Sequence, residues 1–403
     1  MQRRTELAPT EAIERYEFLD VLRGVALFGI ISANMISYSR YLYLPDSAKA
    51  AMATHAIDRM LDFLELLLIE GKFYTIFSVL FGVGFSILLS RASAKGLVFH
   101  RFFLRRVFFL FVFGAAHAVL LWHNDILAAY ALCGALLLPF ATARNPTTLA
   151  FATLALLAPL AIKLAGGIPS GLLTGAQNAL LDRFGLTRDT VIDTWARGSF
   201  GDIVRLNLSK WFSQVSFLIT SGMIFKIYGC FLLGFYIGRN EIYKKLELYR
   251  PIIRRVAMGG MAIGLPLNLV YAATFDSGSW PEVLSGTLGV LPLSSAYVCL
   301  CCLMWLDGKG RRWLRHFAPV GRMALTNYVG QSAICAVLFY GPGLGLGGTM
   351  GPTLFLPIGL AVYGFQLVAS RLWLDHFRFG PLEWLWRMLT YGEWIWLAKR
   401  VEV

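Results

Sequence analysis

Charged residues are scarce in this chain of 403 residues. Asp, Glu, Lys and Arg together make up 15% of it, whereas an ordinary soluble protein carries about 25%. Hydrophobic residues make up 57%. This much apolar surface cannot be hidden inside one water-soluble core, but lipid can solvate it. The composition therefore predicts an integral membrane protein.

Cysteine is also sparse, and the motifs of soluble enzymes are missing. The six cysteines all lie in apolar runs, and none stands at metal-ligand spacing from a histidine, so we predict neither a disulfide framework nor a metal site. The sequence has no P-loop, no dinucleotide-binding glycine pattern after a strand, no H-E-x-x-H and no nucleophile elbow, and thus offers no support for ATP-driven transport. No tightly bound cofactor is expected.

Ten apolar runs are each close to the roughly 20 residues that a helix needs to cross a bilayer. They are continuously apolar rather than alternating, which excludes strands as the spanning unit. We therefore predict an all-α, polytopic bundle of about ten transmembrane helices. The runs are 20–38, 72–90, 102–121, 126–143, 147–165, 215–238, 256–275, 283–306, 321–340 and 353–372.

The basic residues predict the orientation of the bundle. The net charge is +13, but Lys and Arg gather in short clusters at 91–106, 244–255 and 309–315 between apolar runs. Such clusters are retained on the cytoplasmic side during insertion, so no nucleic-acid partner is expected. Ten alternating spans place every cluster and both termini in the cytoplasm.

Three regions follow from this topology. Residues 1–165 hold the first five spans, and residues 212–403 hold the last five with a cytoplasmic tail. Residues 166–211 mix charged and apolar positions and are predicted to be an amphipathic segment outside the cytoplasm, although their five basic residues run against the charge rule. In the sixth span Gly234 and Gly238 form a G-x-x-x-G pair that permits close helix packing, including homodimerisation.

Ionisable groups near the first two spans are candidates for function. Asp20 and Arg23 are three residues apart and so share a helix face. They either form an ion pair at the membrane interface or, together with Asn34 further along the helix, line the entrance for an anionic ligand. Glu70 and Lys72 either extend toward the membrane–water interface or contact a polar acceptor molecule. The glycine between them favours a broken start of the helix.

His117 is the strongest candidate for catalysis. It lies near the outer end of the third span, and Asp125 follows about two helical turns later, on the same face if the helix continues. A histidine with a nearby carboxylate suits general-base catalysis, because the carboxylate fixes the tautomer and raises the basicity. The alternative is a buried structural histidine.

Asn327 and Gln331 lie four residues apart in the ninth span, so both amides face one way. They fit either hydrogen bonds between helices or contacts with a ligand inside the bundle.

Several strings of residues resemble the YeiB-like membrane proteins, whose C-terminal half is the domain of unknown function 418. The first half carries Leu19-Asp20-x-x-Arg23-Gly24-x-Ala26-Leu27-x-Gly29-Ile30 with Asn34, Glu70-Gly71-Lys72-Phe73, Phe77-Ser78-x-Leu80-Phe81-Gly82, and Asp125-Ile126-Leu127 with Tyr130. The second half carries Gly321-Arg322-Met323-Ala324-Leu325-Thr326-Asn327-Tyr328, Phe379-Gly380-Pro381-Leu382-Glu383-Trp384-Leu385-Trp386-Arg387 and Thr390-Tyr391-Gly392. This resemblance covers almost the whole chain and implies a multi-pass protein of the bacterial cytoplasmic (inner) membrane.

The opening string is also similar, more loosely, to the transmembrane acyltransferases that modify sugars and glycans. That similarity implies transfer of an acyl group from cytoplasmic acyl-CoA, as co-substrate, to a sugar, glycan or lipid acceptor at the far side of the membrane. Carried over by position, the similarity implies His117 as the catalytic base with Asp125 as its orienter, and Arg23 with Arg105 or Arg106 as ligands of the donor's phosphates. For the same reaction we predict two further groups from the polar residues themselves: the acceptor contacts Glu70, Lys72, Asn34, Asn327 and Gln331, and the structural or gating residues Asp20, Ser78 and Arg322.

The alternative is a transporter or permease for an amphipathic metabolite or lipid, in which the same buried polar groups would form the path. Common transporters carry internal repeats with interrupted helices. The motifs of the first half do not recur in the second, which favours the enzyme.

Overall fold

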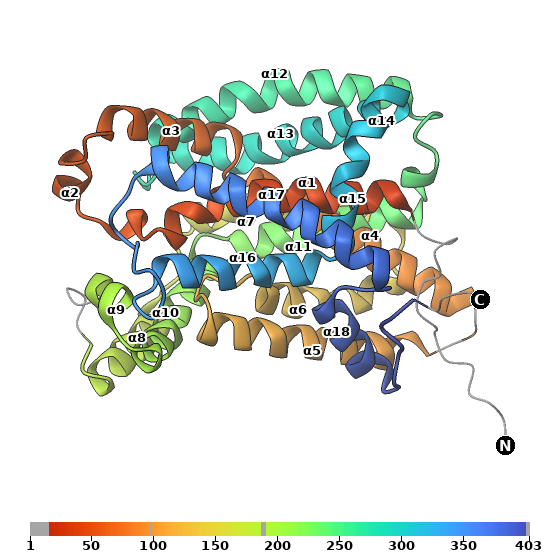
Figure 1. The fold of residues 1–403 in the computed structure, drawn as a ribbon. Coiled ribbons are helices and arrows are strands. Elements are labelled where there is room, and N and C mark those ends of the chain that lie inside the picture. The colour runs from red at the N-terminus through yellow and green to blue at the C-terminus, as the bar shows by residue number, and fades with distance from the viewer. Residues whose placement is uncertain (1–15, 95, 97, 187–190, 400–403) are drawn as a thin grey trace.

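The chain folds into a bundle of helices, seen in a computed structural model that describes residues 16–94, 96, 98–186 and 191–399 (Figure 1). The described part contains no strand, only an isolated bridge between Phe377 and Ala398. The prediction of an all-α membrane protein is confirmed.

Seven described helices are long and apolar enough to cross a membrane, and the count is eight if one bent pair forms a single span. The bent pair is α10 (Phe200–Thr220) with α11 (Met223–Arg239), which meet at 65°. The seven are α1 (Glu17–Tyr38), α3 with α4 (His55–Leu68 and Lys72–Ala94), α5 (Phe99–Leu120), α7 (Asn145–Leu164), α12 (Arg250–Thr274), α13 (Trp280–Leu306) and α17 (Pro352–His376).

This count is lower than the ten predicted, because an apolar run need not be one helix. The run 126–143 divides into α6 (Leu127–Ala135) and the short 3-10 helix η3 (Leu138–Thr142). The run 321–340 holds the end of α15 (Ala318–Arg322) and then α16 (Ala324–Phe339), which has only 16 residues. Hydropathy averages across such breaks, so it registers one span where the backbone changes direction.

The other helices are short. The segment predicted to lie outside the cytoplasm contains α8 (Gly171–Arg183), α9 (Val191–Arg197) and the first half of α10. A capping box starts α10, because the Ser199 hydroxyl accepts from the Asp202 amide and the Asp202 carboxylate accepts from the Ser199 amide. The remaining short helices are α2 (Asp46–Ala50), α14 (Gly308–Leu314), α18 (Pro381–Tyr391), η2 (Tyr41–Tyr43), η4 (Ile242–Lys244) and η5 (Arg315–Phe317).

Glycine lets α1 lie at the centre of the bundle, packed on α4, α15, α16 and α17. A Cβ atom on Gly321 would lie 2.6 Å from the Gly24 nitrogen and 2.8 Å from the Asp20 carbonyl carbon. The G-x-x-x-G pair serves the same purpose, because Gly234 packs against Val79 of α4 and its partner glycine against Ser86. The pair joins two helices of one chain, as close packing through small residues predicts.

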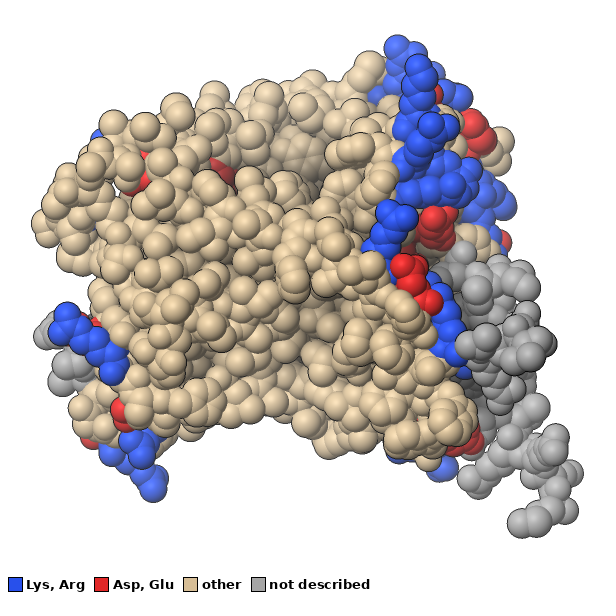
Figure 2. Space-filling model, viewed as in Figure 1, with Lys and Arg blue, Asp and Glu red and all other residues tan. Residues whose placement is uncertain are grey.

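The charges divide the surface into two ends and an apolar belt (Figure 2). Lys and Arg gather at the end that carries α14 and α18, which we call the basic end, and a smaller group lies over α8 to α10. Contacts at the start of α1 bring the predicted clusters together: Arg315 pairs with Glu17 at 3.1 Å, and the Lys244 ammonium lies 5.6 Å from the Tyr16 ring. We call the other end, which carries α2 and α9, the opposite end.

Candidate functional site

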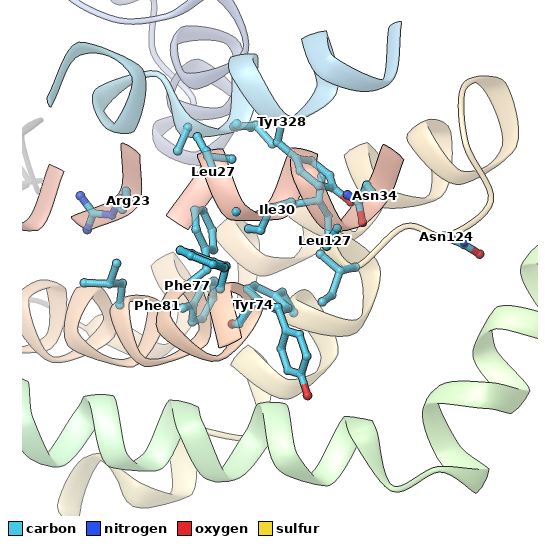
Figure 3. Close-up of a pocket in the computed structure, with 18 of the residues that line it drawn as sticks. Arg23, Leu27, Ile30, Asn34, Tyr74, Phe77, Phe81, Asn124, Leu127 and Tyr328 are labelled. Atoms are coloured by element: carbon cyan, nitrogen blue, oxygen red, sulfur yellow. The ribbon is translucent and has the colours of Figure 1, made fainter. Parts of the chain in front are cut away.

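A cavity of about 720 Å³ is lined by residues from both ends of the bundle. Its walls come mainly from α1, α4, α5, α6, α16 and α18. Figure 3 shows its lining from Arg23 at one extreme to Asn124 at the other. The volume lies within the roughly 300–1,000 Å³ range of sites for small molecules and cofactors.

Arginines line the cavity at the basic end. They are Arg23, Arg106, Arg322 and Arg387. Asp20 holds Arg23 through an ion pair of 2.7 Å, as the i,i+3 spacing predicts. The Arg106 guanidinium lies 3.7 Å from the centre of the Trp386 ring on α18.

Arg105, which the sequence also predicts as a phosphate ligand, is exposed and does not line the cavity. Successive helical residues point about 100° apart. On α5 the side chain of Arg106 faces the cavity, and that of Arg105 faces away.

The half-buried carboxylate of Glu383, which lines the cavity, joins α18 to the start of α16. It accepts hydrogen bonds from the amides of Leu325 (2.6 Å) and Thr326 (3.1 Å), and from the Thr326 hydroxyl. Burial raises the pKa of Glu383, and the hydrogen bonds from Thr326 oppose this rise. Arg322 donates to the carbonyl of Arg378 at 3.0 Å. These bonds fix the cavity wall where α18 packs against the start of α16.

The middle of the cavity is apolar and aromatic. Leu27, Ile30, Phe77, Phe81 and Leu127 line it, with the polar groups of Asn34, Tyr74, Tyr130 and Tyr328 set among them (Figure 3). Ser78, which the sequence singles out, is buried behind this wall and hydrogen-bonds the Tyr130 hydroxyl at 2.6 Å. The surroundings of the middle section therefore suit an acyl chain.

A chain of buried hydrogen bonds lies behind this wall. His117 Nδ1 is 2.9 Å from Asp125 Oδ1, and His117 Nε2 is 2.7 Å from the Ser332 hydroxyl. The Ser332 hydroxyl is 2.6 Å from that of Tyr38, whose other side-chain partner is Asn34 in the cavity wall. We call this series, from Asn34 to Asp125, the relay.

The predicted partnership of His117 and Asp125 is present in the structure, but its geometry differs from the prediction. Helix α5 ends at Leu120, and the link to α6 folds back so that the carboxylate reaches the imidazole. Asp125 also accepts from the amide of Ala128 at 2.8 Å. His117 is only 3% exposed and does not line the cavity.

His123 is the histidine that lines the cavity, at the opposite end, and the prediction missed it. Its Nε2 is 3.0 Å from the Tyr43 hydroxyl, and its ring stacks on that of Trp195 with centroids 5.4 Å apart. Burial, and then the charges of Arg40 and Lys210, hold the pKa of His123 well below its usual range, so the imidazole is neutral at pH 7. Its place in a polar link with no Lys or Arg, two residues before Asp125, was the available signal.

Glu70 also lines the opposite end, together with Glu65. Lys72 lies behind them, fully buried, and donates to the carbonyl of Leu66 at 2.6 Å. The helix breaks here as expected, since Gly71 between α3 and α4 has φ +84°, a conformation that favours glycine.

Asn327 and Gln331 join α16 to α17 instead of lining the cavity. Asn327 donates to Ser370 at 2.9 Å, and Gln331 donates to Gln366 at 2.9 Å. Gln366 in turn donates to the carbonyl of Asn327 at 2.8 Å. These contacts fit the alternative that Asn327 and Gln331 form hydrogen bonds between helices. Within the described residues no group of three or more His, Cys, Asp or Glu side chains could hold a metal ion.

Comparisons with known proteins agree with this picture of a multi-pass membrane protein but assign no activity. Residues 237–393 match the family described as "Protein of unknown function (DUF418)". The "Uncharacterized protein YxaH" of Bacillus subtilis (strain 168) is 32% identical over 421 residues, which cover 99% of this chain and all of that protein. The "Uncharacterized protein YeiB" of Escherichia coli (strain K12) is 29% identical over 94% of this chain and 97% of its own length.

A third relative, the "Uncharacterized 39.9 kDa protein in amylase 3'region" of Bacillus acidopullulyticus, is 29% identical over 96% of each chain. No solved structure matches. The full-length similarity to YxaH and the match in the C-terminal half agree, and we conclude that this chain belongs to the DUF418 family.

Proposed function

We propose that this protein is a transmembrane acyltransferase. It takes an acyl group from acyl-CoA at the basic end and passes it to a sugar, glycan or lipid acceptor at the opposite end. The observation that carries the proposal is the cavity, which has arginines at one end, an apolar and aromatic middle, and His123 and Asn124 at the other end. A donor with several phosphates and an acyl chain requires this combination of surroundings.

The donor's phosphates bind at Arg23, Arg106 and Arg387. Guanidinium groups form bidentate, charge-assisted hydrogen bonds with phosphate oxygens. The pantetheine arm extends along Phe77 and Phe81, so that the thioester lies near Asn34 and Tyr328 and the acyl chain lies among the apolar residues of the middle section.

The transfer requires a base. The acceptor hydroxyl attacks the thioester carbonyl, the carbon–sulfur bond breaks, and CoA leaves as a thiolate that takes up a proton. The hydroxyl's proton passes through the hydroxyls of Tyr38 and Ser332 to His117, while Asn34 orients the Tyr38 hydroxyl from the cavity wall. His117 can hold the proton because the carboxylate of Asp125 stabilises the imidazolium. His123 and Asn124 then orient the acceptor.

The basic end faces the cytoplasm in this proposal. Clusters of Lys and Arg are retained on that side during insertion. The basic end therefore meets cytoplasmic acyl-CoA, with both termini there, in the inner membrane of a bacterium. If α6 and α16 each count as a crossing, the bundle has the ten spans that this orientation requires.

Donor binding is the decisive test. Acetyl-CoA and longer acyl-CoAs are titrated into the purified protein by calorimetry and by thermal shift. Arg106→Ala is compared with Arg105→Ala, which removes an adjacent arginine that does not face the cavity. We expect saturable binding that Arg106→Ala weakens roughly tenfold or more and that Arg105→Ala leaves unchanged. Absence of binding by every acyl-CoA, in folded protein, would overturn the proposal.

The second candidate is a transporter, which the bend between α10 and α11 favours. Gly222 has φ +73° at the start of α11, and discontinuous helices of this kind are typical of transporter binding sites. Flux of labelled ligand into liposomes, without loss of its acyl group, would move this alternative to first place. Release of free CoA that depends on an acceptor would support the enzyme.

A further inference from the structure

We propose that Arg40 forms a subsite at the opposite end of the cavity for an acidic group, a carboxylate or a phosphate, carried by the acceptor. The inference rests on the proposed function, since it names the acceptor class. Its test requires no acyl donor, so the two can fail separately.

The first support is the buried charge of Arg40. The side chain is 0% exposed. One of its nitrogens donates to the Ser37 carbonyl at 3.3 Å, whereas Nε and Nη2 have no hydrogen-bond partner among the described residues. Burying a guanidinium with unmet donors is strongly unfavourable unless an acceptor joins it.

The aromatic neighbours of Arg40 do not supply hydrogen-bond acceptors for its Nε and Nη2 groups. The guanidinium carbon of Arg40 lies 3.9 Å from the centre of the Trp195 ring and 4.6 Å from that of Tyr340. The rings interact with the face of the cation. Its N–H groups point outward in the plane of the guanidinium, where only an acceptor in that plane can meet them.

The second support is that other unmet polar groups surround Arg40. Trp195 stacks on His123, and the indole N–H of Trp195 and the Nδ1 of His123 are both buried without partners among the described residues. The same holds for the indole N–H of Trp122 and the amide oxygen of Asn207. Six of the twelve such atoms in the described part of the chain belong to this cluster. Four of the six can only donate, which favours an anion over a cation.

The third support is the backbone of Arg40, which is left-handed with φ +66°. A long side chain rarely adopts this conformation, and strain of this kind is typical of functional sites. The glycine-rich segment after α16 holds the turn: Gly348 donates to the Ser39 carbonyl at 2.7 Å, and a Cβ on Gly347 would lie 3.2 Å from Arg40 Cγ.

The cluster adjoins the cavity. Ser37, Trp122, His123 and Lys210 all line the cavity's opposite end, and the ammonium of Lys210 adds a second positive charge there. The carboxylates at the same end, Glu65 and Glu70, belong to the α3–α4 break around the buried Lys72. Arg40 itself lies behind these residues and does not line the cavity. The acidic group of an acceptor therefore passes between them to reach Arg40, while its hydroxyl faces the middle of the cavity.

The test measures anion binding by the whole protein at constant ionic strength. Thermal shift uses inorganic phosphate and glucuronate, with glucose as the uncharged probe. Native mass spectrometry compares phosphatidylglycerol with phosphatidylcholine, which separates a lipid headgroup from a soluble acid. We expect saturable stabilisation by at least one anionic probe and none by glucose.

Arg40→Gln should weaken that binding roughly tenfold or more. The matched control is Arg239→Gln, because the Arg239 guanidinium also lies over an aromatic ring but its N–H groups already donate to the carbonyls of Phe140, Ala141 and Ala143. If Arg40→Gln does not fold, Trp195→Phe removes one N–H donor while retaining a ring, and it should also weaken binding.

Unchanged anion affinity in a folded Arg40→Gln or Trp195→Phe protein would overturn the inference, as would equal stabilisation by glucose or no response to any anionic probe. Acyl-CoA binding is measured in parallel. Anion binding that depends on Arg40 without acyl-CoA binding would remove the proposed function and leave the subsite standing. Acyl-CoA binding without any anion binding that depends on Arg40 would overturn only the subsite.

Discussion

Substituting Gly321 by alanine would test how the first helix is held in place. Gly321 ends α15 against α1, and its Cβ would overlap the Asp20 carbonyl oxygen. The same atom would lie 2.6 Å from the Gly24 nitrogen and 2.8 Å from the Asp20 carbonyl carbon. Ordinary contacts between such atoms are about 3.5–4.0 Å, and the carbonyl oxygen is the nearest of the three atoms, so the two backbones must move apart by roughly 1.5 Å.

The expected loss of stability follows from that overlap. Overpacking generally costs about 1–3 kcal/mol, and the atoms in the way are backbone that no change of rotamer can remove. We therefore expect a loss near the top of that range, about 3 kcal/mol. Because Asp20 and Arg23 lie on the displaced face of α1, the affinity for acyl-CoA should fall as well.

Gly259→Ala is the matched control, since Gly259 lies within α12 and its Cβ would meet no atom within 4 Å. Alanine in an unobstructed helix adds about 0.5–1 kcal/mol of stability relative to glycine. Unfolding by SDS in mixed micelles, followed by tryptophan fluorescence, measures both variants. Equal stability of Gly321→Ala and Gly259→Ala would refute the close packing of α1 on α15.

Three further predictions concern the cavity. Gly84 lines the cavity, and a Cβ there would meet nothing within 4 Å. Gly84→Leu should therefore abolish acyl-CoA binding, measured by calorimetry, without lowering the Tm. Retained binding would show that the donor binds elsewhere. Ser332→Ala interrupts the relay beside His117. The rate of acyl transfer should then fall roughly 100-fold, while the affinity for acyl-CoA stays unchanged. An unchanged rate would remove the relay from the mechanism. The pKa of His123 is well below its usual range in the folded protein, whereas the unfolded chain protonates it below about pH 6.5. The contribution of neutral His123 to stability is thus complete above that pH and declines as the pH falls, by at most about 1.4 kcal/mol per pH unit. His123→Gln should therefore flatten the dependence of Tm on pH between about 7.5 and 5. An unaltered slope would contradict the buried neutral state.

Much of the fold could be predicted from the sequence, because lipid requires long apolar helices. Every predicted run corresponds to a helix or to two consecutive ones. What hydropathy could not supply was where the backbone turns inside an apolar run, as at Leu136–Leu137 after α6 or at Ser221 between α10 and α11. The turn at Leu136–Leu137 lies among apolar residues and leaves no polar signal. The short break Thr220-Ser221-Gly222 does carry polar and glycine residues, but long apolar flanks outweigh them in a window average.

The candidate site could be predicted only where its contacts are local. The Asp20–Arg23 pair follows from helical spacing, and His117 and Asp125 are close enough in sequence to be considered together. Arg40 gave no local signal, because its aromatic partners Trp195 and Tyr340 lie far along the chain. Nor could spacing show which of two adjacent arginines faces inward, since that depends on how α5 rotates against its neighbours.

The packing of α1 on α15 also sets a schedule for assembly. Gly321 is synthesised about 300 residues after Asp20, which at about 5–20 residues per second takes about 15–60 s. During that interval α1 is already in the membrane with α4 as an early neighbour, while the glycine face that receives α15 is still bare. Until α15 emerges, lipid or the insertion machinery must cover that face and its Asp20–Arg23 pair. The basic end of the cavity is therefore among the last parts to form, and a partly synthesised chain lacks the wall that α15 and α18 complete.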